Sequence, residues 1–255
     1  MMAYRTRPMR VQIRQLVRMW MRLGAHRHKV VAATQVALWH RQGVMPDVTH
    51  IDSLLTRHHL ISDQVDRREL RIILSELDRR LQNDPAGVVV EFGCYIGTTS
   101  LFIRRLLDMH PSTHDFHVYD SFEGLPEKSD FDASPAGTQF VAGELDASRK
   151  EFVMQFKKAG LMTPKIHKGW FSELASSAIP SNIMFAYLDG DYYESIRDSL
   201  NLVTPHLSDE WTIVVDDYAN EALPGAARAV NEWLENMRAN LRIEASLAII
   251  HSKTS

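Results

Sequence analysis

Two pairs of aspartates in the C-terminal half of the chain could act together chemically, because each pair directly follows a short apolar run. The pairs are Asp189 with Asp191, after residues 183–188, and Asp216 with Asp217, after residues 211–215. Such runs are typical of buried strands in a parallel sheet, and ligands of open α/β sheets bind beyond the carboxyl ends of those strands. Four carboxylates in one crevice need a cation to offset their charge, and carboxylate oxygens suit a hard divalent ion such as Mg²⁺. The pattern therefore predicts a metal-assisted enzyme.

A glycine-containing turn, Glu91-Phe-Gly-Cys-Tyr-Ile-Gly97, forms a second candidate site where a predicted strand meets a helix. Gly93 and Gly97 allow a tight turn and the close approach of a ligand to the backbone. Their spacing differs from the Gly-x-Gly-x-x-Gly of dinucleotide sites, and Tyr95 would crowd a pyrophosphate. Glu91 would repel phosphate but attract an ammonium group, which suits the methionine end of S-adenosylmethionine.

An acid follows at the end of the next predicted strand, in Tyr119-Asp120, where it can accept both hydroxyls of a ribose. Asp120 comes 29 residues after Glu91, a separation that fits one β-α-β step. The glycines alone would also fit a purely structural turn, but the added acid favours a cofactor site.

Strand and helix patterns alternate from residue 63 to the end of the chain. Helices are predicted over residues 63–81, 98–108, 148–159, 194–203 and 225–240, and strands over residues 88–92, 116–119, 165–167, 183–188, 211–215, 242–244 and 247–250. This alternation predicts an α/β fold with a doubly wound, mostly parallel sheet and helices on both faces. The non-periodic residues 123–144 are expected to form a long loop that can act as a lid.

The N-terminal segment differs from the rest of the chain in charge. Of the 29 basic residues, nine lie in residues 1–46, which contain no acid, so the remaining 20 stand against all 32 acids. Within a predicted helical region, residues 10–40, arginines recur at every fourth position: Arg10, Arg14, Arg18 and Arg22. A helix on a membrane surface or nucleic acid is one interpretation, and an arm that packs on its own domain or on a partner subunit is the favoured one. We therefore predict a basic helical arm (1–62) before a cofactor-binding domain (63–255), a homo-oligomer formed through the arm, and no nucleic-acid partner.

Composition narrows the class of protein further. The chain is 45% hydrophobic and 24% charged, as globular proteins usually are. No run reaches the roughly 20 apolar residues of a membrane span, and the start lacks the pattern of a secretory signal. Cys94 is the single cysteine, which excludes an intrachain disulfide framework and a multi-cysteine metal site. A cytoplasmic location is expected.

Five motifs taken together resemble the macrocin O-methyltransferase family, which consists of Mg²⁺- and S-adenosylmethionine-dependent sugar methyltransferases of antibiotic biosynthesis. The motifs are Glu91-Phe-Gly-Cys-Tyr-Ile-Gly97, Tyr119-Asp-Ser-Phe-Glu-Gly-Leu-Pro126, Gly169-Trp-Phe171, Leu188-Asp-Gly-Asp-Tyr-Tyr-Glu-Ser195 and Asp216-Asp-Tyr218. They follow the family's order. The resemblance implies a seven-stranded, Rossmann-like sheet of the class I methyltransferase type. It also implies a small-molecule acceptor, namely a sugar or a glycosylated metabolite with vicinal hydroxyls.

The resemblance implies a role for each matching residue. The metal would be held by Asp189, Asp216 and Asp217, and Asp191 would be the general base near the acceptor hydroxyl. The cofactor-binding residues would be Glu91, Gly93 and Gly97 at the methionine end, with Tyr95 and Thr98 of the same turn, Asp120 on the ribose, and Ser121, Phe122, Trp170 and Phe171 around the adenosine.

Other interpretations of the same residues remain open. A metal-dependent hydrolase or phosphoryl-transfer enzyme could use the carboxylates, but it would need a lysine in the first turn, where Thr98-Thr-Ser100 stand. A non-catalytic binding module would not need an intact metal set. Structural roles are also available, since Asp191 could cap the helix that starts near Glu194 and Asp217 could cap a turn.

Overall fold

The computed structural model describes residues 49–83, 86–111 and 113–253. The predicted helical region 10–40 and most of the basic arm therefore lie outside the described residues. Within the described ranges, no helix has both the length and the apolarity needed to cross a membrane.

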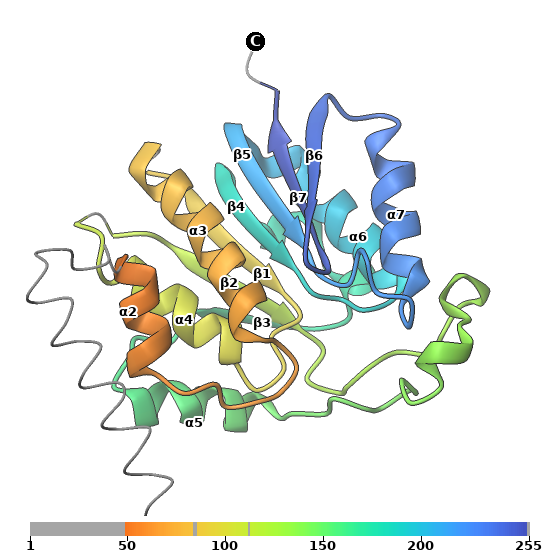
Figure 1. Cartoon of the computed structure of the whole chain (residues 1–255), viewed down its shortest axis with the longest axis horizontal. Helices are drawn as coiled ribbons and strands as arrows, with labels where there is room; N and C mark the ends of the chain where they lie inside the picture. The colour runs from red at the N-terminus through yellow and green to blue at the C-terminus, as the bar shows by residue number, and fades with distance from the viewer. Residues whose placement is uncertain (1–48, 84–85, 112, 254–255) are drawn as a thin grey trace, which may run out of the picture. The chain divides into compact units, whose positions relative to one another are not determined.

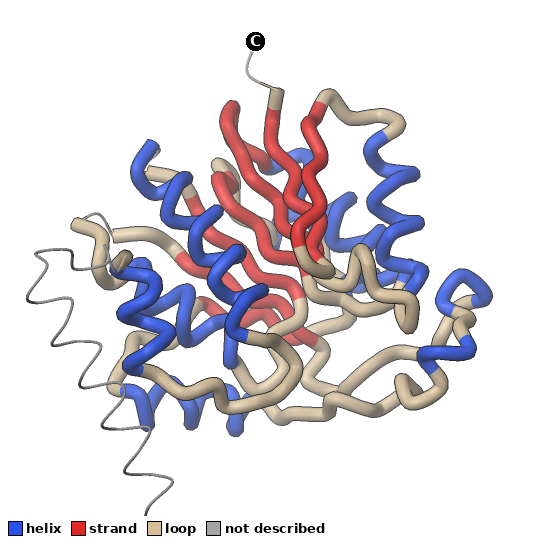
Figure 2. Tube along the Cα trace, viewed as in Figure 1, coloured by secondary structure: helices blue, strands red, loops and turns tan. Residues whose placement is uncertain are grey.

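A seven-stranded sheet forms the centre of the described domain, with strand order β3-β2-β1-β4-β5-β7-β6 (Figures 1 and 2). The strands are β1 (Val88–Phe92), β2 (Phe116–Asp120), β3 (Lys165–Lys168), β4 (Ile183–Leu188), β5 (Leu207–Val215), β6 (Ala239–Glu244) and β7 (Leu247–Ser252). Strands β1 to β5 are parallel, and β7 runs antiparallel to both β5 and β6. The prediction of a mostly parallel seven-stranded sheet is confirmed.

Within the described residues, six α-helices cover the two faces of this sheet. They are α2 (His50–Arg57), α3 (Arg67–Asn83), α4 (Thr98–Leu107), α5 (Arg149–Ala159), α6 (Tyr193–Val203) and α7 (Pro224–Leu234). One hydrophobic core joins the sheet to α2, α3, α4 and α5, and a second core joins it to α6 and α7. Figure 1 shows α6 and α7 on the opposite side of the sheet from α3. The doubly wound arrangement follows, because the inner strands are buried on both faces and consist almost entirely of apolar residues.

Helix α3 begins at Arg67, four residues later than the apolar periodicity predicts. The cause is a cap at Asp66, whose side chain accepts hydrogen bonds from the backbone N–H groups of Arg68 at 2.7 Å and Glu69 at 2.8 Å. The Glu69 side chain in turn accepts the backbone N–H of Asp66 at 3.3 Å, which completes a capping box. Residues 61–65 are left as an irregular segment that is free to line a site.

Helix α7 ends at Leu234, so the predicted helix over residues 225–240 is too long. Residues 239–244 instead form the edge strand β6, which pairs with β7 from Ala239↔Ser252 to Glu244↔Leu247. Strand β5 also starts at Leu207 rather than at Trp211. In both places pairing with a neighbouring strand overrides the local helical or polar pattern.

Helix α2 packs into the domain although it falls within the predicted arm. Its residues Ile51, Leu54 and Leu55 are buried in the core that α3 and α4 share. The compact unit accordingly begins at His50. The division into an arm and a domain near residue 62 remains a prediction.

Candidate active site

The carboxyl ends of four adjacent strands are joined by backbone hydrogen bonds that continue the ladder. The N–H of Gly93 donates to Tyr119 at 2.9 Å, the N–H of Asp189 to Phe92 at 2.8 Å, and the N–H of Asp216 to Leu188 at 2.9 Å. The residues just after β2, β1, β4 and β5 therefore meet at one edge of the sheet. The strand order turns back on itself between β1 and β4, which is where open α/β sheets bind ligands.

A cavity of about 240 Å³ opens at this edge. Eleven of the predicted site residues line it: Glu91, Gly93, Tyr95, Thr98, Asp120, Ser121, Trp170, Phe171, Asp189, Asp191 and Asp217. Gly97, Phe122 and Asp216 stand outside this lining. Phe122 contacts the ring of Phe152 edge-on, and a Cβ on Gly97 would lie 2.9 Å from that same ring, so both residues serve packing behind the turn.

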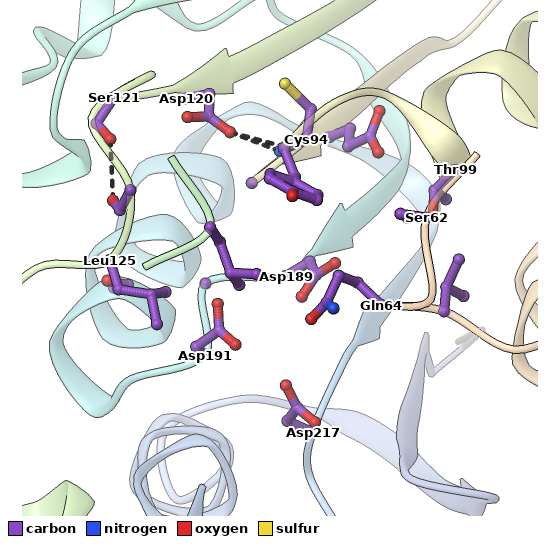
Figure 3. A pocket seen from close by; sticks show the side chains of 18 of the residues that line it. Ser62, Gln64, Cys94, Thr99, Asp120, Ser121, Leu125, Asp189, Asp191 and Asp217 are labelled. Atoms are coloured by element: carbon purple, nitrogen blue, oxygen red, sulfur yellow. Dashed lines mark hydrogen bonds between the residues drawn. The ribbon is translucent and has the colours of Figure 1, made fainter. Parts of the chain in front are cut away.

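Asp189, Asp191 and Asp217 each bring one carboxylate oxygen to within 4.8 Å of the others. Figure 3 shows the three side chains turned toward a common space. Burial, followed by the charges of the neighbouring aspartates, raises the pKa of Asp189 and of Asp191 well above the usual value. The same causes raise the pKa of Asp217 to about 7. These oxygens repel one another, and a hard divalent cation fits both their spacing and their chemistry.

Asp216 lies beneath this cluster and is only 6% exposed. One of its oxygens accepts the hydroxyl of Tyr187 at 2.6 Å, and the other accepts the backbone N–H of Asp217 at 2.8 Å and the hydroxyl of Ser246 at 3.3 Å. Burial raises the pKa of Asp216, whereas these hydrogen bonds lower it. The structure thus brings Asp189, Asp191 and Asp217 together and holds Asp216 below them.

The backbone is strained at two of the clustered aspartates. Asp191 has φ of 60° and Asp217 has φ of 58°, a left-handed conformation that costs a non-glycine residue about 1–2 kcal/mol. The first residues after β4 and β5 must turn sharply to aim a carboxylate back across the strand ends. Strain of this kind is usually retained at functional sites.

Gly93 is required by the close approach of two strand ends. Its φ is 83°, and a Cβ at this position would lie 1.8 Å from the carbonyl oxygen of Asp189. Just before it, the carboxyl of Glu91 is 1% exposed and accepts the hydroxyl of Ser100 at 2.5 Å. Burial is the main cause that raises the pKa of Glu91 to about 8. An ammonium group in the cavity would stabilise the ionised form of this buried acid.

Asp120 links the glycine turn to the loop after β2. One oxygen accepts the backbone N–H groups of Cys94 at 2.8 Å (Figure 3) and of Tyr95 at 3.1 Å. The other accepts the backbone N–H of Phe122 at 2.7 Å. These donors fix the carboxylate at the cavity wall. Because a carboxylate oxygen accepts more than one hydrogen bond, Asp120 keeps capacity for ribose hydroxyls.

Aromatic rings stack behind the wall formed by Trp170 and Phe171. The ring of Tyr119 is stacked on Phe92 at 4.3 Å and on His167 at 4.4 Å between centroids, and Phe171 meets Phe92 edge-on at 5.2 Å. The stack makes a rigid apolar boundary at the side of the cavity where β2 and β3 end. Such a boundary suits a flat heterocycle.

Several lining residues were not predicted from the sequence. They are Ser62, Asp63, Gln64, Val65, Thr99, Leu125, Phe140 and Asn220, among others. The helix predicted to start at residue 63 covers three of these residues, although Asp66-x-x-Glu69 is a capping signature that places the start of the helix at Arg67. Ser62 is tied to the glycine turn through a 2.6 Å hydrogen bond with Thr98. Asn220 donates to Asp217 at 2.7 Å and so orients a clustered carboxylate.

The predicted lid is fastened to the domain by a buried acid. Its segment contains two short 3₁₀ turns, Asp130–Asp132 and Pro135–Gly137. The carboxylate of Asp132 is fully buried and accepts the backbone N–H of Tyr193, at the start of α6, at 2.7 Å. Ser129 donates to the other Asp132 oxygen at 2.6 Å. The loop thus contacts the helix that follows Asp191.

The fold is that of the class I methyltransferases. The solved O-methyltransferase NovP matches with a TM-score of 0.64 and 23% identity over 74% of this chain and 81% of that chain. The calicheamicin methyltransferase CalS11 matches with a TM-score of 0.59 and 20% identity over 81% of this chain and 93% of that chain. At these identities the likeness shows the fold alone.

The sequence defines the family. Residues 59–254 match the sequence profile of the family described as macrocin-O-methyltransferase (TylF), so the chain belongs to that family. The 8-demethyl-8-(2,3-dimethoxy-alpha-L-rhamnosyl)-tetracenomycin-C 4'-O-methyltransferase of Streptomyces olivaceus is 33% identical over 142 residues, which are 53% of this chain and 54% of that relative. The demethyldecarbamoylnovobiocin O-methyltransferase of Streptomyces niveus is 28% identical over 159 residues, 59% of each chain. The chain thus spans little more than half the length of either curated relative.

Proposed function

We propose that the protein transfers a methyl group from S-adenosylmethionine to a hydroxyl of a sugar, or of another vicinal diol, with the help of a divalent cation. The carboxylate ligands favour Mg²⁺ as that cation. The observation that carries this proposal is a single cavity that joins the buried acid Glu91 to the carboxylates of Asp189, Asp191 and Asp217. The buried acid suits the ammonium group of the methyl donor. The carboxylate cluster suits a cation that a chelating acceptor could bind.

The donor is assigned to the side of the cavity formed by β1, β2 and β3. Glu91 accepts the ammonium of the methionine end, and Gly93 lets the donor approach the backbone. Asp120 accepts the ribose hydroxyls, and Trp170 with Phe171 bounds the adenine. Tyr95, Thr98 and Ser121 complete this wall. A phosphate-bearing substrate would be repelled by Glu91, which disfavours the hydrolase and phosphoryl-transfer alternatives.

The acceptor is assigned to the side formed by β4 and β5. Asp189 and Asp217 hold the cation, with Asp216 below them as the third acid of the set, and Asp191 takes the proton of the acceptor hydroxyl. When bound, the cation supplies Lewis-acid activation and orients two vicinal oxygens. The left-handed backbone of Asp191 turns its carboxylate to face the cluster, where a hydroxyl proton would be within reach.

The relatives support a sugar acceptor. The Streptomyces olivaceus enzyme is named for a 4'-O-methyl transfer on a rhamnosyl-tetracenomycin. The walls of this cavity combine the carboxylates with two apolar lid residues, Leu125 and Phe140, and with the adjoining Leu145, as an acceptor with both hydroxyls and carbon surface requires.

Calorimetry on the purified chain tests the proposal. We expect S-adenosylhomocysteine to bind with micromolar affinity, and a labelled methyl group to pass from the donor to at least one member of a panel of glycosides and catechols only when Mg²⁺ is present. Absence of S-adenosylhomocysteine binding, with and without Mg²⁺, would overturn the proposal.

The basic segment 1–46 supports a second prediction, that copies of the chain associate through the arm. Light scattering of the full chain at low and at high salt measures this. A monomer at both ionic strengths contradicts it.

A further inference from the structure

The hydroxyl of Tyr187 lies between the carboxylates of Asp189 and Asp216. Its oxygen is 2.6 Å from Oδ2 of Asp216 and 3.2 Å from Oδ2 of Asp189. Tyr187 is in β4, two residues before Asp189, and its side chain is 0% exposed. A single hydroxyl hydrogen is therefore shared between carboxylates that come from two neighbouring strands.

This contact opposes the mutual repulsion of the two acids. Like charges repel strongly in a buried site, and a hydroxyl that donates to both carboxylates favours their approach. Ser246 also reaches Asp216, but at 3.3 Å, and its shorter bond, at 2.6 Å, goes to Glu69. Of these two hydroxyls, that of Tyr187 is the closer to Asp216.

Packing does not account for a tyrosine here. The side chain belongs to the core that joins the sheet to α2, α3, α4 and α5, and a phenyl ring would fill the same space. The hydroxyl adds a charge-assisted hydrogen bond to the carboxylates and nothing to the apolar contacts. Groups that bond to metal ligands from outside commonly change metal affinity by 10- to 100-fold.

We propose that Tyr187 is a positioning residue of the cation site, whose hydroxyl, anchored on Asp216, holds the carboxylate of Asp189 in the orientation that receives the ion. The inference rests on the proposed function, since it needs a cation at the cluster. It assigns Tyr187 no contact with the donor, which lies on the Glu91 side of the cavity.

Tyr187→Phe tests this directly, and Tyr119→Phe is a matched control. Tyr119 is also a fully buried sheet tyrosine, but its hydroxyl donates to the carbonyl oxygen of Ala178 at 2.9 Å and makes no hydrogen bond to the clustered acids. Mg²⁺ affinity is measured by calorimetry on the wild type and on both variants, each saturated with S-adenosylhomocysteine. The affinity of S-adenosylhomocysteine without metal is measured alongside.

We expect Tyr187→Phe to weaken Mg²⁺ binding by about 10- to 100-fold while S-adenosylhomocysteine binding stays within about threefold of wild type. Tyr119→Phe should leave the Mg²⁺ affinity unchanged. The hydroxyl of Ser246 contacts Asp216 from outside the sheet core, so Ser246→Ala should also weaken Mg²⁺ binding, by a smaller factor. This variant serves as the test if Tyr187→Phe does not fold. Wild-type Mg²⁺ affinity in Tyr187→Phe, or in Ser246→Ala should that variant stand alone, overturns the inference. A wild-type protein that binds no Mg²⁺ overturns the cation site itself and, with it, this role.

Discussion

The backbone of Gly93 lies so close to that of Asp189 that a Cβ on Gly93 would stand 1.8 Å from the Asp189 carbonyl oxygen. The glycine turn after β1 and the acidic turn after β4 are thus in direct contact. A shift of either turn must move the other, so the proposed donor side and the proposed acceptor side of the cavity share one rigid support.

Gly93→Ala should disrupt this support. The φ of 83° and the clash with backbone act together, so we expect a loss of stability of more than about 3 kcal/mol and no measurable S-adenosylhomocysteine binding. Urea unfolding and calorimetry measure the two effects. Gly160→Ala is the matched control, because Gly160 has φ of 67° with nothing within 4 Å of the added Cβ. It should cost only about 1–2 kcal/mol and leave binding intact. Equal losses in the two variants would show that the contact with Asp189 is unimportant.

Glu91→Gln should separate stability from function. The pKa of Glu91 in the folded chain, about 8, is above the ordinary value of 4.5, so the folded state holds a proton that the unfolded state has released. The stability of the wild type should therefore fall as pH rises from 4.5 through 8. Glu91→Gln should remove that loss, which is on the order of 5 kcal/mol at pH 8.5. Binding of S-adenosylhomocysteine by the wild type should strengthen by about 10-fold from pH 6.5 to 8, because the carboxylate must ionise to accept the ammonium. The variant should bind weakly with no such dependence. A variant that binds as the wild type does removes Glu91 from the donor site.

His117 should make the fold sensitive to mild acid. Burial, with smaller contributions from Lys165 and His167, lowers the pKa of His117 from 6.5 to about 4. The unfolded chain therefore binds a proton that the folded chain excludes, and stability is lost as pH falls from 6.5 toward 4. His117→Phe keeps the stack on His167 and removes this proton. Between pH 7 and pH 5, both proteins lose unfolding free energy, and we expect the loss in the variant to be smaller than in the wild type by about 1 kcal/mol. Parallel pH dependence in urea unfolding would rule out His117 as a source of acid sensitivity.

Asp132→Ala should release the lid. The substitution leaves the N–H of Tyr193 and the hydroxyl of Ser129 without their acceptor, at a cost of about 1.5–3 kcal/mol. We expect limited proteolysis within residues 123–147 to accelerate by about 10-fold or more. Mass spectrometry of the fragments locates the cleavage sites. Asp130→Ala, an exposed acid in the same 3₁₀ turn, should cleave at the wild-type rate. Similar rates for both variants would mean that Asp132 does not fasten the lid.

The sequence predicted those parts of the fold that depend on local pattern. Buried strands β1 and β4 are apolar on both faces, so their runs of valine, isoleucine, phenylalanine and leucine identify them and place the acids at their ends. It was less accurate at the bounds of elements. The strand predicted over residues 242–244 starts earlier, at Ala239, because β6 pairs with β7 along its whole length, and the helical pattern of residues 225–240 does not indicate that pairing.

The site was predictable in its residue types but not in its arrangement. The acids of β4 and β5 were expected to meet, and Asp189, Asp191 and Asp217 do so. The position of Asp216 below them depends on Tyr187 and Ser246, one in a strand and the other in the turn between β6 and β7. Segment 62–65 reaches the cavity because α3 starts late, at the local cap that Asp66 forms.

The division of labour among the aspartates is the central claim, and Asp191→Asn tests it most directly. The variant should retain Mg²⁺ affinity within about 10-fold and S-adenosylhomocysteine affinity near that of the wild type, while turnover falls by about 100-fold or more because no base takes the hydroxyl proton. Asp189→Asn, in contrast, should lose Mg²⁺ binding and turnover together. Calorimetric Mg²⁺ titration of Asp191→Asn decides the matter. Affinity close to wild type with lost turnover is the predicted result, and loss of Mg²⁺ binding as severe as in Asp189→Asn would contradict Asp191 as the base and make it a metal ligand.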